Sequence, residues 1–245
     1  MKTKRLIFLI KGELIRLHKY KVTTISLLIA IIWGVVLYFV EGDIFNSLLP
    51  FLILVDATIM SLMYIGSVMF FEKKESTIST MLVTPAKHSE IILSKIFANT
   101  IHNFLSTALI IVAFILIKNI QINYWLISLA IIIVTLFHTT IGLLLSYYQK
   151  DFTTMLMSIM MISFVLLIPS ALYAFNVLKA DFWEYLLLFN PIQAASELIN
   201  QGFKPINLDW KYYFSLCYLI IGGILIYKYL VLRNFKNYAV SISGV

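Results

Sequence analysis

Few side chains in this sequence have the types and spacing that catalysis would need. No G-x-x-x-x-G-K-[ST] run is present to hold nucleotide phosphates, and no H-E-x-x-H pair could bind zinc on one helix face. The four histidines are scattered, and the two facing carboxylates of an intramembrane protease are missing, since only Asp56 lies within a long apolar run. We therefore predict no catalytic site and no metal site, and we predict that the chain is not an enzyme.

Asp56 needs an explanation because an ionisable group within a membrane is costly and commonly functional. Two interpretations stay open. The carboxylate could lie near the outer end of its apolar run, held by a Tyr, Ser or Lys partner, or it could line the path of a substrate. Pro169, which removes a backbone donor from a later apolar run and should bend that helix, joins Asp56 as a candidate pathway residue. His102 and His138 are expected to form hydrogen bonds between helices.

The elements that carry these residues are predicted from composition and length. Hydrophobic residues make up 61% of the chain and charged residues 13%, compared with about 25% charged residues in ordinary globular proteins. A span needs about 20 apolar residues, and the backbone in lipid must satisfy its own hydrogen bonds. We therefore predict one all-α integral membrane domain over residues 1–245. Its six transmembrane helices are expected at 22–40, 48–71, 98–117, 124–148, 153–177 and 212–232.

The distribution of Lys and Arg predicts the orientation of these spans. Fifteen of the 19 basic residues fall on the side that holds both ends of the chain, and only four fall on the other side: Lys118, Lys179, Lys204 and Lys211. Both termini should therefore face the cytoplasm. This asymmetry also explains the net charge of +7 without a nucleic acid partner. Cys217 lies in an apolar run and, as a single cysteine, excludes an internal disulfide.

Two further segments are apolar in part but are not predicted to span. Residues 1–21 place Leu6, Ile10, Leu14 and Leu17 on one helical face, which is typical of an interfacial helix on the inner membrane surface. Residues 178–211 suit an outer re-entrant segment with Trp183, Tyr185 and Trp210 at headgroup depth.

Within that outer segment, Asn190 reads as a helix N-cap and Pro191 as the first helical residue, with Gln193 closing a capping box. With Glu197, these residues form a candidate outer gate.

The remaining feature is the charged stretch EKKESTISTMLVTPAKHSEIILSK, residues 72–95, between the second and third spans. Its pattern resembles the signature of type 2 ATP-binding-cassette export permeases, in which an acidic and basic cluster precedes Gly-Thr-Leu, a short helix ends in Thr-Pro, and Glu-Ile-Leu-Leu-Gly-Lys follows. The six spans, the N-terminal helix and Asn190-Pro191 extend the resemblance over the chain. Ser76 and Ser94 replace the usual glycines, which makes a positive φ at Ser76 less expected.

The resemblance implies that residues 72–96 form a cytoplasmic coupling helix, which docks on a separate ATPase subunit. Ile78, Met81 and Leu82 would offer an apolar anchor, while the surrounding charges would pair with those of the partner. The expected coupling residues are Glu72, Lys73, Glu75, Thr77, Ile78, Met81, Leu82 and Pro85. A solvated loop is the alternative.

The expected function is that of the membrane-spanning permease subunit of an ATP-driven ABC exporter, similar to the small six-span drug-exporter permeases, in a bacterial cell membrane. Two permease copies, as a homodimer or heterodimer, would form the pathway within membrane lipid. This chain would hold no cofactor, because the partner ATPase binds ATP and Mg. Methionines and aromatics in span five suggest an amphipathic or drug-like cargo, although they also suit lipid contact. Self-protection against antimicrobial peptides and a non-transporting scaffold or sensor are the alternatives.

Overall fold

The structure, a computed structural model, describes residues 2–40, 43–117, 121–174, 177–204 and 208–243. Within these residues all regular elements are helices, and there is no strand. Six helices are long and apolar enough to cross a membrane: Val22–Phe39, Leu48–Lys74, His88–Leu116, Tyr124–Tyr147, Phe152–Tyr173 and Trp210–Ala239. The chain is thus an all-α, multi-pass membrane protein, as predicted.

The elements follow one another along the chain with short connections. In order, they are α1 (Lys2–Lys19), α2 (Val22–Phe39), α3 (Asp43–Val55), the π-helical turn η1 (Asp56–Met60), α4 (Ser61–Lys74), α5 (Thr77–Leu82), α6 (His88–Ile117), α7 (Tyr124–Tyr147), α8 (Phe152–Ala174), α9 (Asp181–Leu187), α10 (Pro191–Asn200), the 3₁₀ turn η2 (Gln201–Phe203), α11 (Trp210–Leu225), the π-helical turn η3 (Ile226–Val231) and α12 (Leu232–Ser243).

Two spans extend beyond their predicted bounds. α6 begins at His88, ten residues before the predicted start of span three, because the Glu90 carboxylate accepts a hydrogen bond from the Lys87 backbone N–H at 2.9 Å. The last part of the predicted coupling segment is therefore the first part of a span. Span six likewise continues through η3 into α12, which ends at Ser243.

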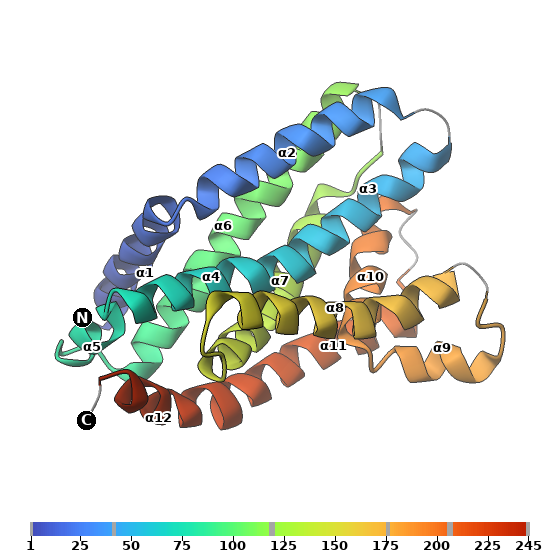
Figure 1. Ribbon diagram of the computed structural model, residues 1–245. Helices are drawn as coiled ribbons and strands as arrows, with labels where there is room; N and C mark the ends of the chain where they lie inside the picture. Colours follow the sequence, from blue (N-terminus) through green and yellow to red (C-terminus); the bar gives the residue numbers. More distant parts are fainter. Residues whose placement is uncertain (1, 41–42, 118–120, 175–176, 205–207, 244–245) are drawn as a thin grey trace.

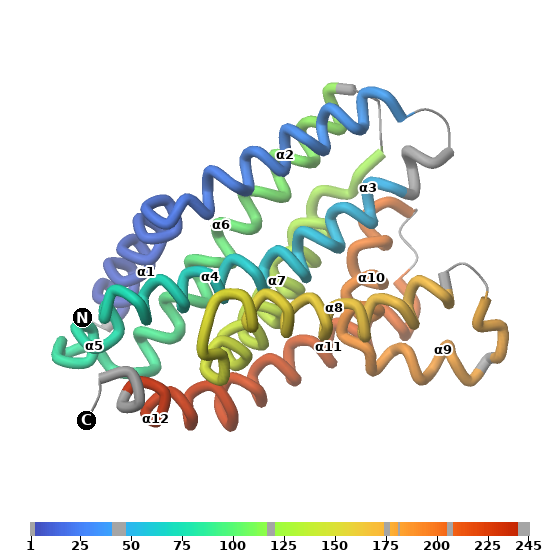
Figure 2. Tube along the Cα trace, in the orientation of Figure 1, coloured from blue at the N-terminus to red at the C-terminus, as the bar shows by residue number. Residues whose placement is uncertain are grey.

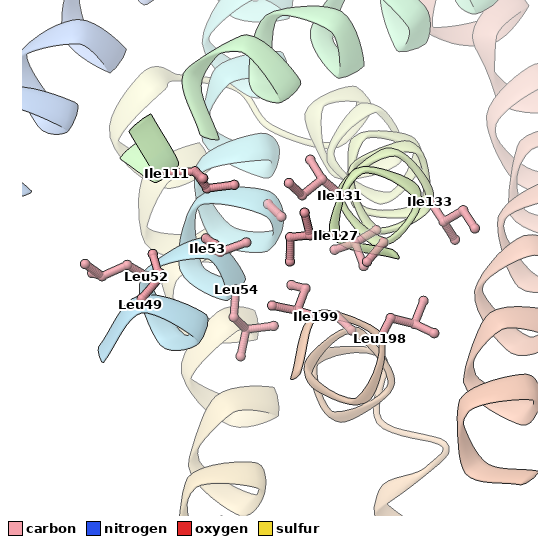
Figure 3. Packing of buried hydrophobic residues seen from close by; sticks show 14 of the residues in the cluster. Leu49, Leu52, Ile53, Leu54, Ile111, Ile127, Ile131, Ile133, Leu198 and Ile199 are labelled. Atoms are coloured by element: carbon pink, nitrogen blue, oxygen red, sulfur yellow. The ribbon is translucent and has the colours of Figure 1, made fainter. Parts of the chain in front are cut away.

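The spans form one bundle with the two termini at the same end (Figures 1 and 2). We call this the terminus end; it holds α1, α5 and α12. The opposite, distal end holds α9 and the last turn of α2. The main core lies toward the distal end, where buried aliphatic side chains of α3, α6, α7 and α10 converge (Figure 3). Ile53 and Phe114 are completely buried there.

The outer segment is more deeply integrated than its sequence suggests. α10 contributes Ile192, Leu198 and Ile199 to the main core and packs against α3, α7, α8 and α11. At the distal end, α9 lies beside α8, and Tyr185 stacks on Trp210 with 6.0 Å between ring centroids. Residues 205–207 of the predicted segment lie outside the described residues. α10 therefore enters the bundle between spans, as a re-entrant helix does.

α1 packs part of its predicted apolar face against the bundle. Leu17, Ile10 and Leu14 pack against Tyr64 and Val68 of α4 and against Ala98 of α6. The outward face of α1 carries Ile7, Phe8 and Ile15 between lysines. The amphipathic pattern thus predicted the helix, and part of its apolar face binds the protein because α4 and α6 offer a matching apolar surface.

Candidate functional site

The candidate site is the coupling segment at the terminus end, built around the short helix α5. Ser76 precedes it with φ 55° and ψ 21°, in the left-handed region. The prediction that serine makes a positive φ less expected is therefore wrong at this position. The Ser76 carbonyl accepts the Thr80 backbone N–H at 3.3 Å, which starts the helix. Pro85, with no N–H of its own, follows shortly after the helix ends.

The apolar side of α5 packs inside the chain. Ile78 is 1% exposed, and it lies in a cluster with Ile91 of α6 and with Phe235 and Tyr238 of α12. Met81 and Leu82 are partly buried against the same cluster. The expectation that these side chains anchor the helix to a partner is thus corrected for Ile78, which is buried within the chain, whereas Met81 and Leu82 are only half-buried. Their role in coupling stays a prediction, and it would act through the position of α5.

α1 holds both ends of the coupling segment. At its start, Glu75 accepts hydrogen bonds from Lys19 Nζ at 2.8 Å and from Tyr20 Oη at 2.9 Å. At its end, Arg5 donates to the Pro85 carbonyl at 3.0 Å and to the Glu90 carboxylate at 2.8 Å. The carboxylates of Glu75 and Glu90 are therefore paired within the chain.

Beneath these contacts lies a buried ion cluster of Glu13, Arg16, Glu72 and Lys95. Lys95 Nζ donates to Glu13 at 2.9 Å and to Glu72 at 2.6 Å, and Arg16 contacts Glu13 at 2.6 Å and Glu72 at 3.1 Å. Glu72 and Lys95 are almost completely buried. Glu72 therefore faces the interior, where it joins α4 to α1 and α6, and not a partner protein. The two acidic and two basic side chains sum to zero formal charge, and their mutual attraction offsets the free energy cost of removing them from water.

The electrostatics of α1 follow from these pairs. Burial opposes ionisation of Glu13, but the Lys95 ammonium and the Arg16 guanidinium outweigh it and hold the pKa of Glu13 below its usual value. Hydrogen bonds from Lys19 and Tyr20 similarly lower the pKa of the exposed Glu75 carboxyl. Both carboxylates are therefore ionised at neutral pH, when α1 is docked.

The other predicted coupling residues are also in contact within the chain. Lys73 Nζ donates to the Gln149 carbonyl at 3.3 Å, near the α7–α8 connection. Thr77 is half-buried beside Tyr20. What α5 leaves exposed is a small outward face of Thr80, Val83 and Thr84, with Val83 85% exposed. The sequence pointed to the helix but not to this face.

A polar ladder on α6 connects the coupling segment to Asp56. Its members, Lys95, Asn99, Asn103 and Thr107, recur every four residues and so share one helix face. Asn99 Nδ2 donates to Thr139 Oγ1 at 2.8 Å, and Asn103 Nδ2 donates to the Asp56 carbonyl at 3.2 Å. All four side chains are buried. This spacing is visible in the sequence and could have revealed the ladder.

Asp56 itself opens the η1 turn and is 3% exposed. Thr107 Oγ1 on α6 donates to its Oδ2 at 2.6 Å, and the Ser106 side chain also lies close to the carboxyl. Its side chain does not line any of the described pockets. Pro169 is half-buried in α8.

Asn190 links the outer segment to span five. Its Oδ1 accepts the Ile192 backbone N–H at 3.0 Å, which confirms the N-cap with Pro191 as the first residue of α10. Its Nδ2 donates to the Leu166 carbonyl at 2.6 Å, one turn before Pro169. The predicted capping box is wrong, because Gln193 Nε2 donates to Glu197 at 3.0 Å along α10 instead.

An apolar pocket of about 280 Å³ opens between α6, α7 and α11. Ile96, Phe137, Leu219 and Ile224 are among its walls, and Thr140 and Tyr227 add two hydroxyl groups. Such a pocket suits an apolar group such as an acyl chain.

These features define an integral membrane bundle in which a short helix between spans two and three is fastened to both chain ends. The family model of the ABC-2 type transporter matches residues 4–203, more than half of the chain. The chain therefore belongs to the ABC-2 type transporter family, whose domain is the membrane-spanning part of an ABC transporter and works with an ATPase subunit. A comparison with curated proteins gives no match.

Proposed function

We propose that this chain is the permease subunit of an ATP-driven exporter, and that separate cytosolic ATPase subunits bind ATP and Mg and dock on α5. The observation that carries the proposal is the two-sided character of α5. Thr80, Val83 and Thr84 face outward at the terminus end, whereas Ile78 anchors the helix to α6 and α12. A partner that contacts the outward face would therefore move the spans behind it.

The contacts around α5 support this transmission. Glu75 and Glu90 tie the segment to α1, and the buried ion cluster ties α1 to α4 and α6. Since these ties lie on both sides of α5, a displacement of α5 would shift the end of span two and the start of span three together. The termini then face the cytoplasm, as the excess of basic residues predicts.

The pathway is proposed to form between two permease copies. α2, α8 and α11 expose most of their apolar surface, and lipid and a second copy would cover them. On α8, Met157, Met160, Met161 and Phe164 share one exposed face. Because methionine side chains adapt to varied shapes, this face suits an amphipathic or drug-like cargo.

Co-purification tests the docking surface. Val83→Glu places a carboxylate at the centre of the outward face, and we expect the proposed partner ATPase to bind roughly thirty-fold more weakly, as for loss of about 2 kcal/mol at an interface. Val177→Glu is the matched control, because Val177 is 61% exposed beyond the distal end of α8. Export should fall with binding in Val83→Glu and stay normal in Val177→Glu. Normal binding and export in both variants would contradict the proposal.

A further inference from the structure

Asp56 has no compensating positive charge among the described residues. None of the ion pairs found in the described part of the chain includes it. Oδ2 accepts the hydrogen bond from Thr107, whereas Oδ1 is buried and has no hydrogen-bond partner. A buried carboxylate without a compensating charge costs several kcal/mol. This carboxyl group therefore needs either a bound cation or a proton.

Whether a cation or a proton binds depends on how many oxygen atoms around Asp56 are free to act as ligands. A π-helical turn could free backbone carbonyls to coordinate a metal ion, but two carbonyls here already accept side-chain hydrogen bonds. The Leu54 carbonyl accepts from Thr58 Oγ1 at 2.6 Å, and the Asp56 carbonyl accepts from Asn103. A metal ion needs several oxygen ligands at once. One free carboxylate oxygen can bind a proton but does not make a metal site.

A hydroxyl group beside the Asp56 carboxyl suits a protonated acid. The Ser106 side chain lies close to both the Asp56 carboxyl and the Tyr64 phenol. The Tyr64 Oη atom is also buried without a hydrogen-bond partner. A carboxylic acid O–H could donate to the Ser106 hydroxyl, since a hydroxyl oxygen can accept a hydrogen bond.

The other ionisable groups near η1 do not supply a fixed charge. The elements packed against it are α3, α4, α6, α7 and α8. In the middle of these elements the ionisable side chains are Tyr64, His102 and His138. His138 Nδ1 lies 2.8 Å from the Val134 carbonyl, and His102 meets Ser26 and the Tyr64 ring. Lys95 pairs with Glu13 and Glu72, and it lies twelve residues before Thr107, about 18 Å along α6.

We propose that Asp56 is an intramembrane proton-binding site, neutral in this arrangement, which releases its proton when the η1–α6 contact opens to water. On release, the O–H bond of the acid breaks, the proton passes to water, and the carboxylate keeps the electron pair; closure reverses the step. The binding site itself does not depend on the proposed function, whereas the opening step does. The π-helical turn is consistent with a movable contact, since such turns frequently occur at functional sites.

Infrared spectroscopy of the purified permease in nanodiscs tests the binding site. At neutral pH, the wild type should show a protonated carboxyl band that is lost in Asp56→Asn and retained in Asp151→Asn, a control on an exposed carboxylate. Thr107→Val should shift the band, because Oδ2 loses its hydrogen bond; this variant identifies the band if Asp56→Asn does not fold. Absence of the band, or a band unchanged in both Asp56→Asn and Thr107→Val, overturns the proposal.

The release step has its own measurement. In the complex with its ATPase, a pH-sensitive dye should report proton release and uptake during turnover in the wild type but not in Asp56→Asn. Turnover without proton release overturns the release step. Because the infrared result requires no ATPase, a failure of the proposed export function is distinguishable from a failure of the proton site.

Discussion

At the scale of single residues, the structure of the terminus end includes residues whose conformation or charge is unfavourable for their type. Ser76 adopts a left-handed conformation that glycine would adopt without strain, and Glu13 is ionised although it is 3% exposed. Each departs from what its residue type favours. Each is also stabilised, Ser76 by the helix that starts at its carbonyl and Glu13 by two cations.

Ser76→Gly should therefore stabilise the protein. The left-handed conformation costs a non-glycine residue roughly 1–2 kcal/mol, and the exposed Ser76 side chain forms no cap hydrogen bond that would be lost. We expect a gain of about 1 kcal/mol in the free energy of unfolding, since glycine also gains entropy in the unfolded chain. Ser89→Gly, within the first turn of α6, should lower stability instead. Equal effects of the two substitutions on denaturant unfolding would contradict the strain at Ser76.

Glu13 makes the docking of α1 sensitive to acid. Its pKa is lowered in the folded protein, so its contribution to stability is complete above about pH 4.5, its ordinary value, and is lost as the pH falls through the lowered pKa. Thermal unfolding across the acidic range should show this loss in the wild type. In Glu13→Gln the loss of stability at acidic pH should be smaller, because the glutamine side chain does not bind a proton in this range. An identical acid profile in the two proteins would show that Glu13 does not carry the effect.

At the scale of elements, side chains join helices that are far apart in the sequence. α1 lies on α4 and α6, α12 covers the apolar side of α5, and α10 is attached to α8 by Asn190. The ends of the spans are thereby fixed to the short helices that a partner or a substrate would meet.

Asn190 provides a test of such a link, because it caps α10 and also bridges to α8. Asn190→Ala should cost about 2 kcal/mol, from the cap and from the hydrogen bond to the Leu166 carbonyl. Asn190→Ser keeps a capping oxygen and should cost about half of that. Asn123→Ala removes only the cap of α7 and is the matched control.

Hydrogen exchange of α10 and unfolding of the purified protein would measure these costs. Equal losses in Asn190→Ala and Asn190→Ser would show that the cap contributes nothing, and an unchanged stability of Asn190→Ser would show that the bridge to α8 contributes nothing.

At the scale of the whole molecule, all contacts that fasten α5 gather at the end that holds both termini (Figure 1). This arrangement fits an ABC-2 permease whose ATPase approaches from that side, with the distal end and α10 on the other side of the membrane. The orientation can be measured directly.

Single cysteines in a Cys217→Ala background test the orientation. Lys179→Cys and Gln121→Cys, both exposed at the distal end, should react with an impermeant thiol reagent outside intact cells. Lys74→Cys and Lys150→Cys, exposed at the terminus end, should react only after the cells are opened. Labelling of position 74 from outside would reverse the topology and remove the ATPase from α5.

The sequence by itself determined the six spans and the cap at Asn190, because hydrophobic length and local capping are properties of neighbouring residues. The short helix between spans two and three was expected only from the family resemblance. Only the tertiary structure decided which faces these helices bury. Ile78 packs in one cluster with Phe235. Lys95 pairs with both Glu13 and Glu72. The residues of each group are distant from one another in the sequence. An apolar stripe or a charged side chain in the sequence indicates that the helix needs a contacting surface or a counter-ion. Only the packing of the whole bundle decides whether that contact comes from the same chain or from another protein.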